Sequence, residues 1–135
     1  MKPDVSQLSQ AITRELSKDN DLFVAVLYGS SVTGNLRSDS DIDLAVLYNC
    51  TLSPEKRIAL LERLNKSLPM PVDLVDLSTV SGVILKEILC SGRVLIKKNP
   101  QAFIRLLERL VYNQEDVMPY YYSALRERAK RFANV

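Results

Sequence analysis

The chain has 135 residues, of which 47% are hydrophobic and 25% are charged, and its net charge is +2. This composition is typical of a globular domain, and the length suits one hydrophobic core rather than two. The sequence contains no histidine. Histidine general bases and Ser-His-Asp or Cys-His nucleophiles are therefore excluded, so any chemistry must use carboxylates, hydroxyls, backbone amides, lysine or arginine.

Cysteine usage and hydropathy indicate the compartment. Cys50 and Cys90 lie far apart without CxxC spacing, so we expect reduced thiols rather than a zinc site. No apolar run approaches the roughly 18 residues that a membrane span needs, and the polar start does not resemble a signal peptide. These features predict a cytoplasmic protein without a membrane partner.

The first part of the chain predicts a helix and two buried strands. Apolar residues at helical spacing predict a helix over residues 5–18. A continuous apolar run over 22–28, and a second run over 42–47 that Asp43 interrupts near its start, predict buried strands.

The middle of the chain continues this alternation. A helix is expected over 53–68, because Ser53 can cap its first turn and Pro54 suits the first helical position. Because this helix lies between two strands, we expect them to be joined by a parallel crossover. The elements that follow are a strand, a helix and a short strand, over 72–77, 80–90 and 94–96.

The end of the chain predicts two helices, over 102–112 and from about residue 116 or 119 to 132. We therefore expect a mixed α/β (α+β) domain over 1–98 and a helical appendage over 99–135 within the same compact unit. From residue 97 onward, eight residues are basic and four are acidic. With the tyrosines Tyr120, Tyr121 and Tyr122, this tail suits either contact with a partner or packing on the domain.

Two aspartates at the start of the second strand form the first candidate site. Asp41 and Asp43 are two residues apart, so their side chains point to the same face of a strand. Paired carboxylates are suitable ligands for Mg²⁺. Taken alone, the pair is more typical of two solvated aspartates at a strand edge.

Residues at the end of the first strand favour the functional interpretation. Gly29 permits a close backbone approach, and Ser30 and Ser31 follow it at an expected helix start, where amides bind phosphate. A phosphate site beside a metal pair is what phosphoryl or nucleotidyl transfer requires.

Gly29-Ser30, ten further residues and Asp41-Ile42-Asp43 together resemble the signature of the nucleotidyltransferase superfamily, which is built on the polymerase-β-like palm. Gly34, Arg37 and the block over 40–44 are similar to the minimal, single-domain members. The resemblance covers about residues 22–96 and implies a mixed sheet flanked by helices. These small proteins often carry arginine where Ser31 and Thr33 stand, so here Arg37 and the metals have more triphosphate charge to neutralise.

The family has a third carboxylate on the next strand, for which Asp73 and Asp76 are candidates. They are an odd number of residues apart, so only one can face the metal site. Parallel strands start at the same end of a sheet, and Asp73 opens its strand as Asp41 and Asp43 open theirs. We therefore expect Asp73 to be the third ligand and Asp76 to be a turn residue before Ser78.

The resemblance implies a two-ion mechanism with ATP as substrate. Asp41, Asp43 and Asp73 would hold Mg²⁺ and act as the catalytic residues. The nucleotide would be bound by Gly29, Ser30, Ser31 and Arg37.

The resemblance also implies a partner. Single-domain proteins of this type are often antitoxins of HEPN-domain ribonuclease toxins and add AMP to a toxin tyrosine. We therefore expect a cognate HEPN toxin, with which the chain could form a hetero-oligomer, and no direct binding of nucleic acid. Two alternatives stay open: a non-catalytic module that masks the toxin, and an enzyme that modifies a small hydroxylated substrate such as an antibiotic.

Overall fold

The computed structural model describes residues 4–33, 41–113 and 127–131. Gly34, Arg37, the three tyrosines Tyr120 to Tyr122 and most of the last expected helix lie outside these ranges. The predictions made for them are therefore carried forward as predictions.

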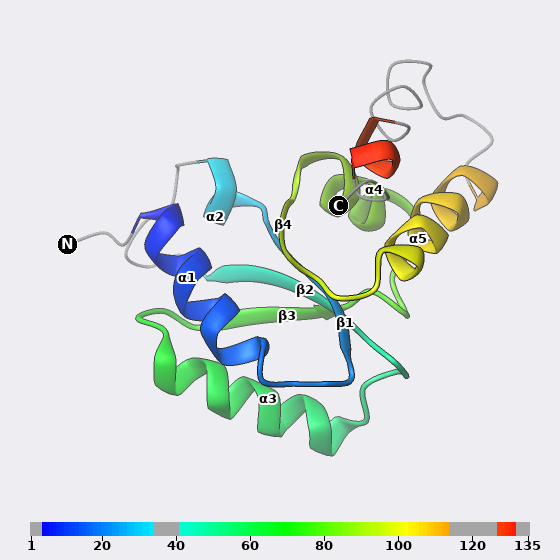
Figure 1. The fold of residues 1–135 in the computed structure, drawn as a ribbon. Coiled ribbons are helices and arrows are strands. Elements are labelled where there is room, and N and C mark those ends of the chain that lie inside the picture. The colour runs from blue at the N-terminus through cyan, green and yellow to red at the C-terminus, as the bar shows by residue number, and fades with distance from the viewer. Residues whose placement is uncertain (1–3, 34–40, 114–126, 132–135) are drawn as a thin grey trace.

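Four strands form one mixed sheet in the order β3-β2-β1-β4 (Figure 1). Strand β1 pairs antiparallel with both β2 and β4, and β2 pairs parallel with β3. The expected parallel crossover is therefore confirmed, as is the mixed α/β fold. The strands are β1 (Leu22–Tyr28), β2 (Ile42–Tyr48), β3 (Val72–Asp76) and β4 (Arg93–Lys97).

Helices cover both faces of this sheet (Figure 1). Helices α1 (Val5–Leu16) and α3 (Pro54–Ser67) pack on one face, and α4 (Gly82–Ser91) and α5 (Pro100–Asn113) pack on the other. A single turn, α2 (Ser30–Thr33), follows β1 directly. It begins where the sequence predicts the helix start after Gly29.

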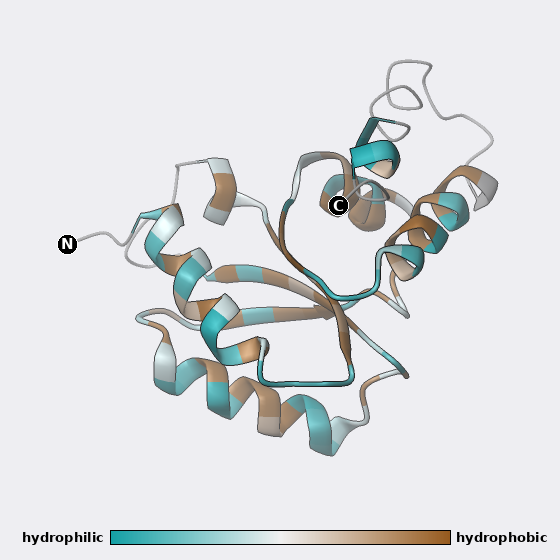
Figure 2. Ribbon diagram, in the orientation of Figure 1, coloured by the Kyte–Doolittle hydropathy of each residue, from teal (hydrophilic) through white to brown (hydrophobic). Residues whose placement is uncertain are grey.

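Burial on both faces explains the continuous apolar runs of the two central strands. In β2, Leu44 and Val46 pack towards α1 and α3, whereas Ala45 between them packs towards α4 and α5. Figure 2 shows alternating hydrophilic and hydrophobic bands on α3 and α5, as expected for helices with one buried side.

Helix α5 contributes to the core. Phe103, Leu106, Leu107 and Leu110 are buried in the cluster that also contains residues of α4 and β1. The described part of the expected appendage therefore forms half of one covering layer, while the domain boundary at residue 98 stays a prediction. In the described parts of the chain, no helix has both the length and the apolar character of a bilayer span.

Local capping accounts for where two helices begin. Ser53 accepts a hydrogen bond from the amide of Lys56 at 3.1 Å, with Pro54 at the first helical position, as the sequence predicts. Asp4 caps α1 by accepting from the amide of Gln7 at 2.7 Å. Elsewhere the element ends differ from expectation by one or two residues, which is common where the last turns fray.

Candidate active site

The register of three strands brings Tyr28, Asp43 and Asp73 into one row across the sheet. Tyr28 is paired with Asp43 across the antiparallel strands β1 and β2, and Asp43 is paired with Asp73 across the parallel strands β2 and β3. Paired residues on adjacent strands point to the same face, so both carboxylates share one side of the sheet. This side is the one covered by α4 and α5, because Tyr28 and Ala45 pack in that cluster.

Asp41 lies directly before β2 and is exposed, as is Asp73, whereas Asp43 is half-buried. Asp41, Asp43 and Asp73 therefore all lie at the end of the sheet where β2 and β3 begin and β1 ends.

Gly29 makes room for Asp43. Its φ is +66°, a conformation that L side chains rarely adopt, and a Cβ at this position would collide with the carboxylate of Asp43. The carbonyl of Gly29 accepts from the amides of Val32 and Thr33, at 3.1 and 3.4 Å, and so begins α2. A glycine is therefore favoured here both by the turn and by the carboxylate packed against it.

Ser31 links the turn after β1 to the start of β2 through a hydrogen bond. It is fully buried, and its Oγ accepts a hydrogen bond from the backbone amide of Asp43 at 3.1 Å. The structure thus places this side chain in the interior, where it fixes the start of β2 against α2. Ser30 and Gly29 are partly exposed.

Burial and charge repulsion act on the buried members of the row. Burial raises the pKa of the Asp43 carboxyl, and the charges of Asp73, Asp41 and Glu87 raise it further. Burial, followed by Asp43, Asp73 and Glu87, raises the pKa of Tyr28 to about 12. Both shifts mean that further negative charge is unfavourable here and that a cation would be stabilising.

The donor set fits Mg²⁺ that is shared with a substrate. Among the described residues, no three acidic or cysteine side chains are gathered closely enough to hold a metal ion by themselves. Mg²⁺ is usually held by one or two carboxylates together with substrate phosphates and water, rather than by a cage of protein ligands alone. Asp43 with Asp41 or Asp73 supplies such a partial set, and phosphate oxygens would complete it.

Asp76 has a different role from Asp73. It is 5% exposed, ends β3, and lies on the opposite face of that strand. Its carboxylate accepts from the amides of Leu52 and Ser78, both at 2.9 Å, and from the hydroxyl of Ser78 at 2.8 Å. Asp76 therefore holds the turn after β3 to the loop after β2, far from Asp43 along the strand.

The structure adds two residues that the sequence alone did not indicate. Tyr28 is cross-strand from Asp43, and Glu87 of α4 is close enough for its charge to raise the pKa of Tyr28 and Asp43. The apolar run containing Tyr28 gave a signal for burial only. Glu87 became visible only once the rotation of α4 on the sheet was known.

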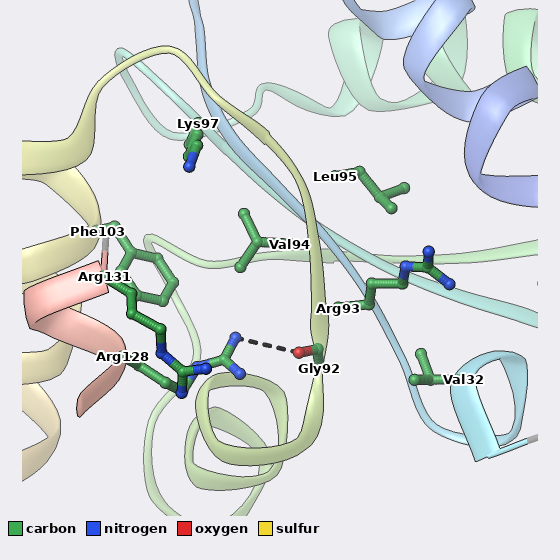
Figure 3. Close-up of a pocket in the computed structure, with 9 residues that line it drawn as sticks. All are labelled: Val32, Gly92, Arg93, Val94, Leu95, Lys97, Phe103, Arg128 and Arg131. Carbon is green, nitrogen blue, oxygen red and sulfur yellow. Dashed lines mark hydrogen bonds between the residues drawn. The ribbon is translucent and has the colours of Figure 1, made fainter. Parts of the chain in front are cut away.

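A separate cavity of about 490 Å³ lies along β4 and contains none of these carboxylates (Figure 3). Its lining includes Arg93, Arg128 and Arg131, and Arg128 donates to the carbonyl of Gly92 at 3.1 Å. Burial and the nearby charge of Arg131 lower the pKa of Arg128. Because the carboxylates lie on β2 and β3, this basic cavity is separate from the site that contains Asp41, Asp43 and Asp73.

A model of the polymerase beta nucleotidyltransferase family matches residues 10–101. This range contains all four described strands and the three carboxylates Asp41, Asp43 and Asp73. No curated protein gives a significant match to the sequence.

Solved structures of toxin-antitoxin complexes share the fold. A toxin-antitoxin complex with AMP-PNP contains a chain 25% identical to this one, with a TM-score of 0.65, over 93% of this chain and 96% of that chain. A chain of an MntA-HepT toxin-antitoxin structure is 24% identical, with a TM-score of 0.64, over 96% of both chains.

A third structure contains a tri-AMPylated HEPN toxin from Shewanella oneidensis in complex with an MNT antitoxin. The similarity is 24% identity with a TM-score of 0.60, over 96% of this chain and 97% of that chain. The likeness to these structures shows a shared fold, and the family match over residues 10–101 confirms the nucleotidyltransferase resemblance stated from the sequence.

The contact between Gly29 and Asp43 predicts a difference between two glycines. Gly29→Ala should destabilise the fold more than Gly82→Ala, because both glycines have positive φ but a Cβ at Gly82 meets nothing within 4 Å. The conformational cost common to both is roughly 1–2 kcal/mol. Urea unfolding measures how much more unfolding free energy is lost in Gly29→Ala than in Gly82→Ala. Asp43→Ala in the Gly29→Ala background should remove this extra loss. Equal losses at the two glycines would contradict the contact.

The raised pKa of Asp43 predicts how stability changes with pH. Above the folded pKa, the ionised carboxylate is disfavoured in the folded protein relative to the unfolded chain, whereas below the unfolded pKa of about 4 both states are protonated. In EDTA, Asp43→Asn should therefore increase the free energy of unfolding at pH 7, and the gain should disappear as the pH falls through 4. Glu62→Gln on the exposed side of α3 serves as the control. A gain at pH 7 that persists unchanged at pH 3 would show that ionisation of Asp43 is not its cause.

Proposed function

This chain belongs to the polymerase beta nucleotidyltransferase family, and we propose that it transfers AMP from ATP, with Mg²⁺, to a tyrosine hydroxyl of a HEPN-domain ribonuclease and so acts as its antitoxin. The observation that carries the proposal is the row in which Asp43 and Asp73 stand side by side next to Gly29. The AMPylated toxin in complex with an MNT antitoxin supports the choice of acceptor. The neighbour solved with AMP-PNP supports ATP as the donor.

Each residue of the site has a separate role in the proposed reaction. Bound Mg²⁺ would neutralise charge on the triphosphate and lower the pKa of the acceptor hydroxyl. Asp41 and Asp43 would hold the metal at the start of β2, Asp73 would add a ligand from β3, and phosphate oxygens of the substrate would complete the set. Gly29 and Ser30 orient the β- and γ-phosphates with backbone amides, which leaves the α-phosphorus open. Ser31 keeps Asp43 in place through the hydrogen bond to its amide.

The bond changes follow from this arrangement. The tyrosine oxygen attacks the α-phosphorus in line with the oxygen that bridges to the β-phosphate, and the new phosphorus–oxygen bond forms as the bridging bond breaks. Asp73 accepts the hydroxyl proton, and pyrophosphate leaves. Arg37, which lies outside the described residues, is the predicted further contact to the nucleotide.

An exposed site suits a macromolecular acceptor. Asp41 and Asp73 are both exposed, so a hydroxyl on the surface of another protein can reach them. The added AMP brings about one negative charge and considerable bulk to the acceptor. On an RNA-binding surface, it would repel phosphates and occupy the space that RNA needs.

The two candidate aspartates of β3 should separate catalysis from folding. Asp73→Asn should lower transfer by at least about 100-fold, the usual contribution of a general base, with little change in the free energy of unfolding. Asp76→Asn should lower the free energy of unfolding by about 1–3 kcal/mol, because an amide nitrogen then faces N–H donors. Its transfer activity should survive at a temperature at which the protein is folded. The reverse order of activity loss would assign the third ligand to Asp76.

Catalytic inhibition is distinguished from masking by stoichiometry. Substoichiometric protein, ATP and Mg²⁺ should inactivate the HEPN ribonuclease encoded at the same locus and add AMP to a tyrosine, measured by RNA cleavage and protein mass. The Asp41→Asn, Asp43→Asn double variant should do neither, whereas Glu62→Gln should behave as the parent.

Each alternative function has its own outcome in this assay. Inhibition that needs equimolar protein and is unchanged in the double variant would replace the proposal with a binding module. Label from α-labelled ATP that appears in a small molecule, and not in protein, would indicate an enzyme for hydroxylated small substrates.

A further inference from the structure

The cavity beside β4 combines apolar walls with positive charge. Its volume of about 490 Å³ lies within the range of roughly 300–1,000 Å³ that is usual for small-molecule sites. Among the described residues, no carboxylate lines it. Its charged side chains are Arg93, Lys97, Arg128 and Arg131, and its apolar side chains are Val32, Val94, Leu95 and Phe103. Such a lining is complementary to an anion that also has an apolar part.

Two of the arginines lie together. Arg128 and Arg131 are three residues apart in the helical segment over 127–131, so they project from the same side of it. Figure 3 shows both guanidinium groups on the side of β4 where Val94 and Phe103 also lie. In the part of the chain that the structure describes, neither arginine forms an ion pair with a carboxylate. Two like charges in this position repel each other, and an anion bound to both would remove the repulsion.

Arg128 is held in position without using all its donors. One terminal nitrogen donates to the carbonyl of Gly92 at 3.1 Å, which fixes the guanidinium against the end of α4. The Nε of the same side chain is buried and has no hydrogen-bond partner within the described ranges. A buried donor without a partner is unfavourable, and an arginine fork matches the oxygens of a phosphate group. The orientation of Arg128 is therefore set before a ligand binds, while its capacity for hydrogen bonds is not exhausted.

The edge position of β4 raises the alternative of an added strand. Among the described residues, β4 pairs with β1 alone and so forms one edge of the sheet. The pairing of these strands is irregular between Ala25 and Val26, and Arg93 and Lys97 at the two ends of β4 are exposed. Bulges and exposed cations disfavour the pairing of a further strand. The cavity therefore suits a small ligand better than an extended peptide.

We propose that this cavity binds a nucleoside phosphate, with its phosphate group on Arg128 and Arg131 and its base against Val94 and Phe103. Arginine recognises phosphate oxygens with two parallel hydrogen bonds, and a base offers a flat surface to apolar side chains. The arginines supply the positive charge, so binding here needs no metal ion. The site is distinct from the carboxylates of β2 and β3, and the inference does not depend on the proposed transfer of AMP.

The test measures binding of AMP to the full chain by isothermal titration calorimetry in EDTA. Without a metal ion, the carboxylates repel phosphate, so binding reports on the basic cavity. Adenosine is the uncharged probe. Arg131→Gln removes one cation from the cavity, and because Arg131 is exposed the fold should persist, which urea unfolding checks. Arg105→Gln is the matched control, since Arg105 is exposed on α5 and lies outside this cavity. The Asp41→Asn, Asp43→Asn double variant controls for the carboxylate site.

The parent should bind AMP, and adenosine should bind at least about tenfold more weakly because it lacks the phosphate. Arg131→Gln should raise the Kd for AMP by about tenfold or more, the usual effect of losing a hydrogen bond to a charged group. Arg105→Gln and the double aspartate variant should bind AMP as the parent does.

Four results would overturn the inference. The parent does not bind AMP in EDTA, or it binds adenosine equally well. Arg105→Gln weakens AMP binding as much as Arg131→Gln, which would indicate a general effect of charge. AMP binding is lost in the double aspartate variant and kept in Arg131→Gln, which would place the ligand at the carboxylates. A single-stranded oligonucleotide binds in an Arg131-dependent way whereas AMP does not, which would make the cavity part of a surface for nucleic acid.

Discussion

The carboxylate of Asp43 occupies the space in which a side chain at position 29 would stand. This contact ties the end of β1 to the start of β2, which are far apart in the sequence but paired through Tyr28. Ser31 reinforces it by accepting the amide of Asp43 from within the core. The turn after β1 and the carboxylate of Asp43 are thus held together by a glycine that leaves space for the carboxylate and by a serine that bonds to the backbone of Asp43.

The same arrangement has an energetic cost. Asp43 is half-buried beside other carboxylates, and the resulting rise in its pKa is a loss of stability at neutral pH. The apolar core that covers both faces of β1 and β2 offsets this loss, because its contribution does not depend on the charge of the site. Strain and repulsion of this kind are commonly concentrated where a protein binds ligands, since the ligand then relieves them.

The sequence predicted the elements, the parallel crossover and the difference between Asp73 and Asp76, because these depend on local periodicity and on the alternation of side chains along a strand. Strand parity placed Asp73 on the face of Asp43, and the structure finds the two in register. The sequence could not predict that the side chain of Ser31 points inwards, because a single helical turn can place either of its sides against the sheet. Glu87 was missed for a related reason, since its position depends on how α4 is rotated on β1. The ligand roles of these residues stay predictions.

For the proposed transfer, selection of one acceptor has to arise outside the carboxylates Asp41, Asp43 and Asp73. Asp41 and Asp73 are exposed, and exposed carboxylates with bound metal would accept many hydroxyls that reach them. Selection of one acceptor therefore requires contacts at a fixed distance from the reacting phosphorus, since misplacement by about 1 Å can cost 100-fold in rate. A loop could not fix that distance, but a helix packed on a central strand can. Leu85, Ile88 and Leu89 anchor α4 to the cluster that contains Tyr28, so the outer side of this helix moves with the strand that ends at Gly29. The packing that completes the core thereby also fixes the position of α4 relative to the end of β1.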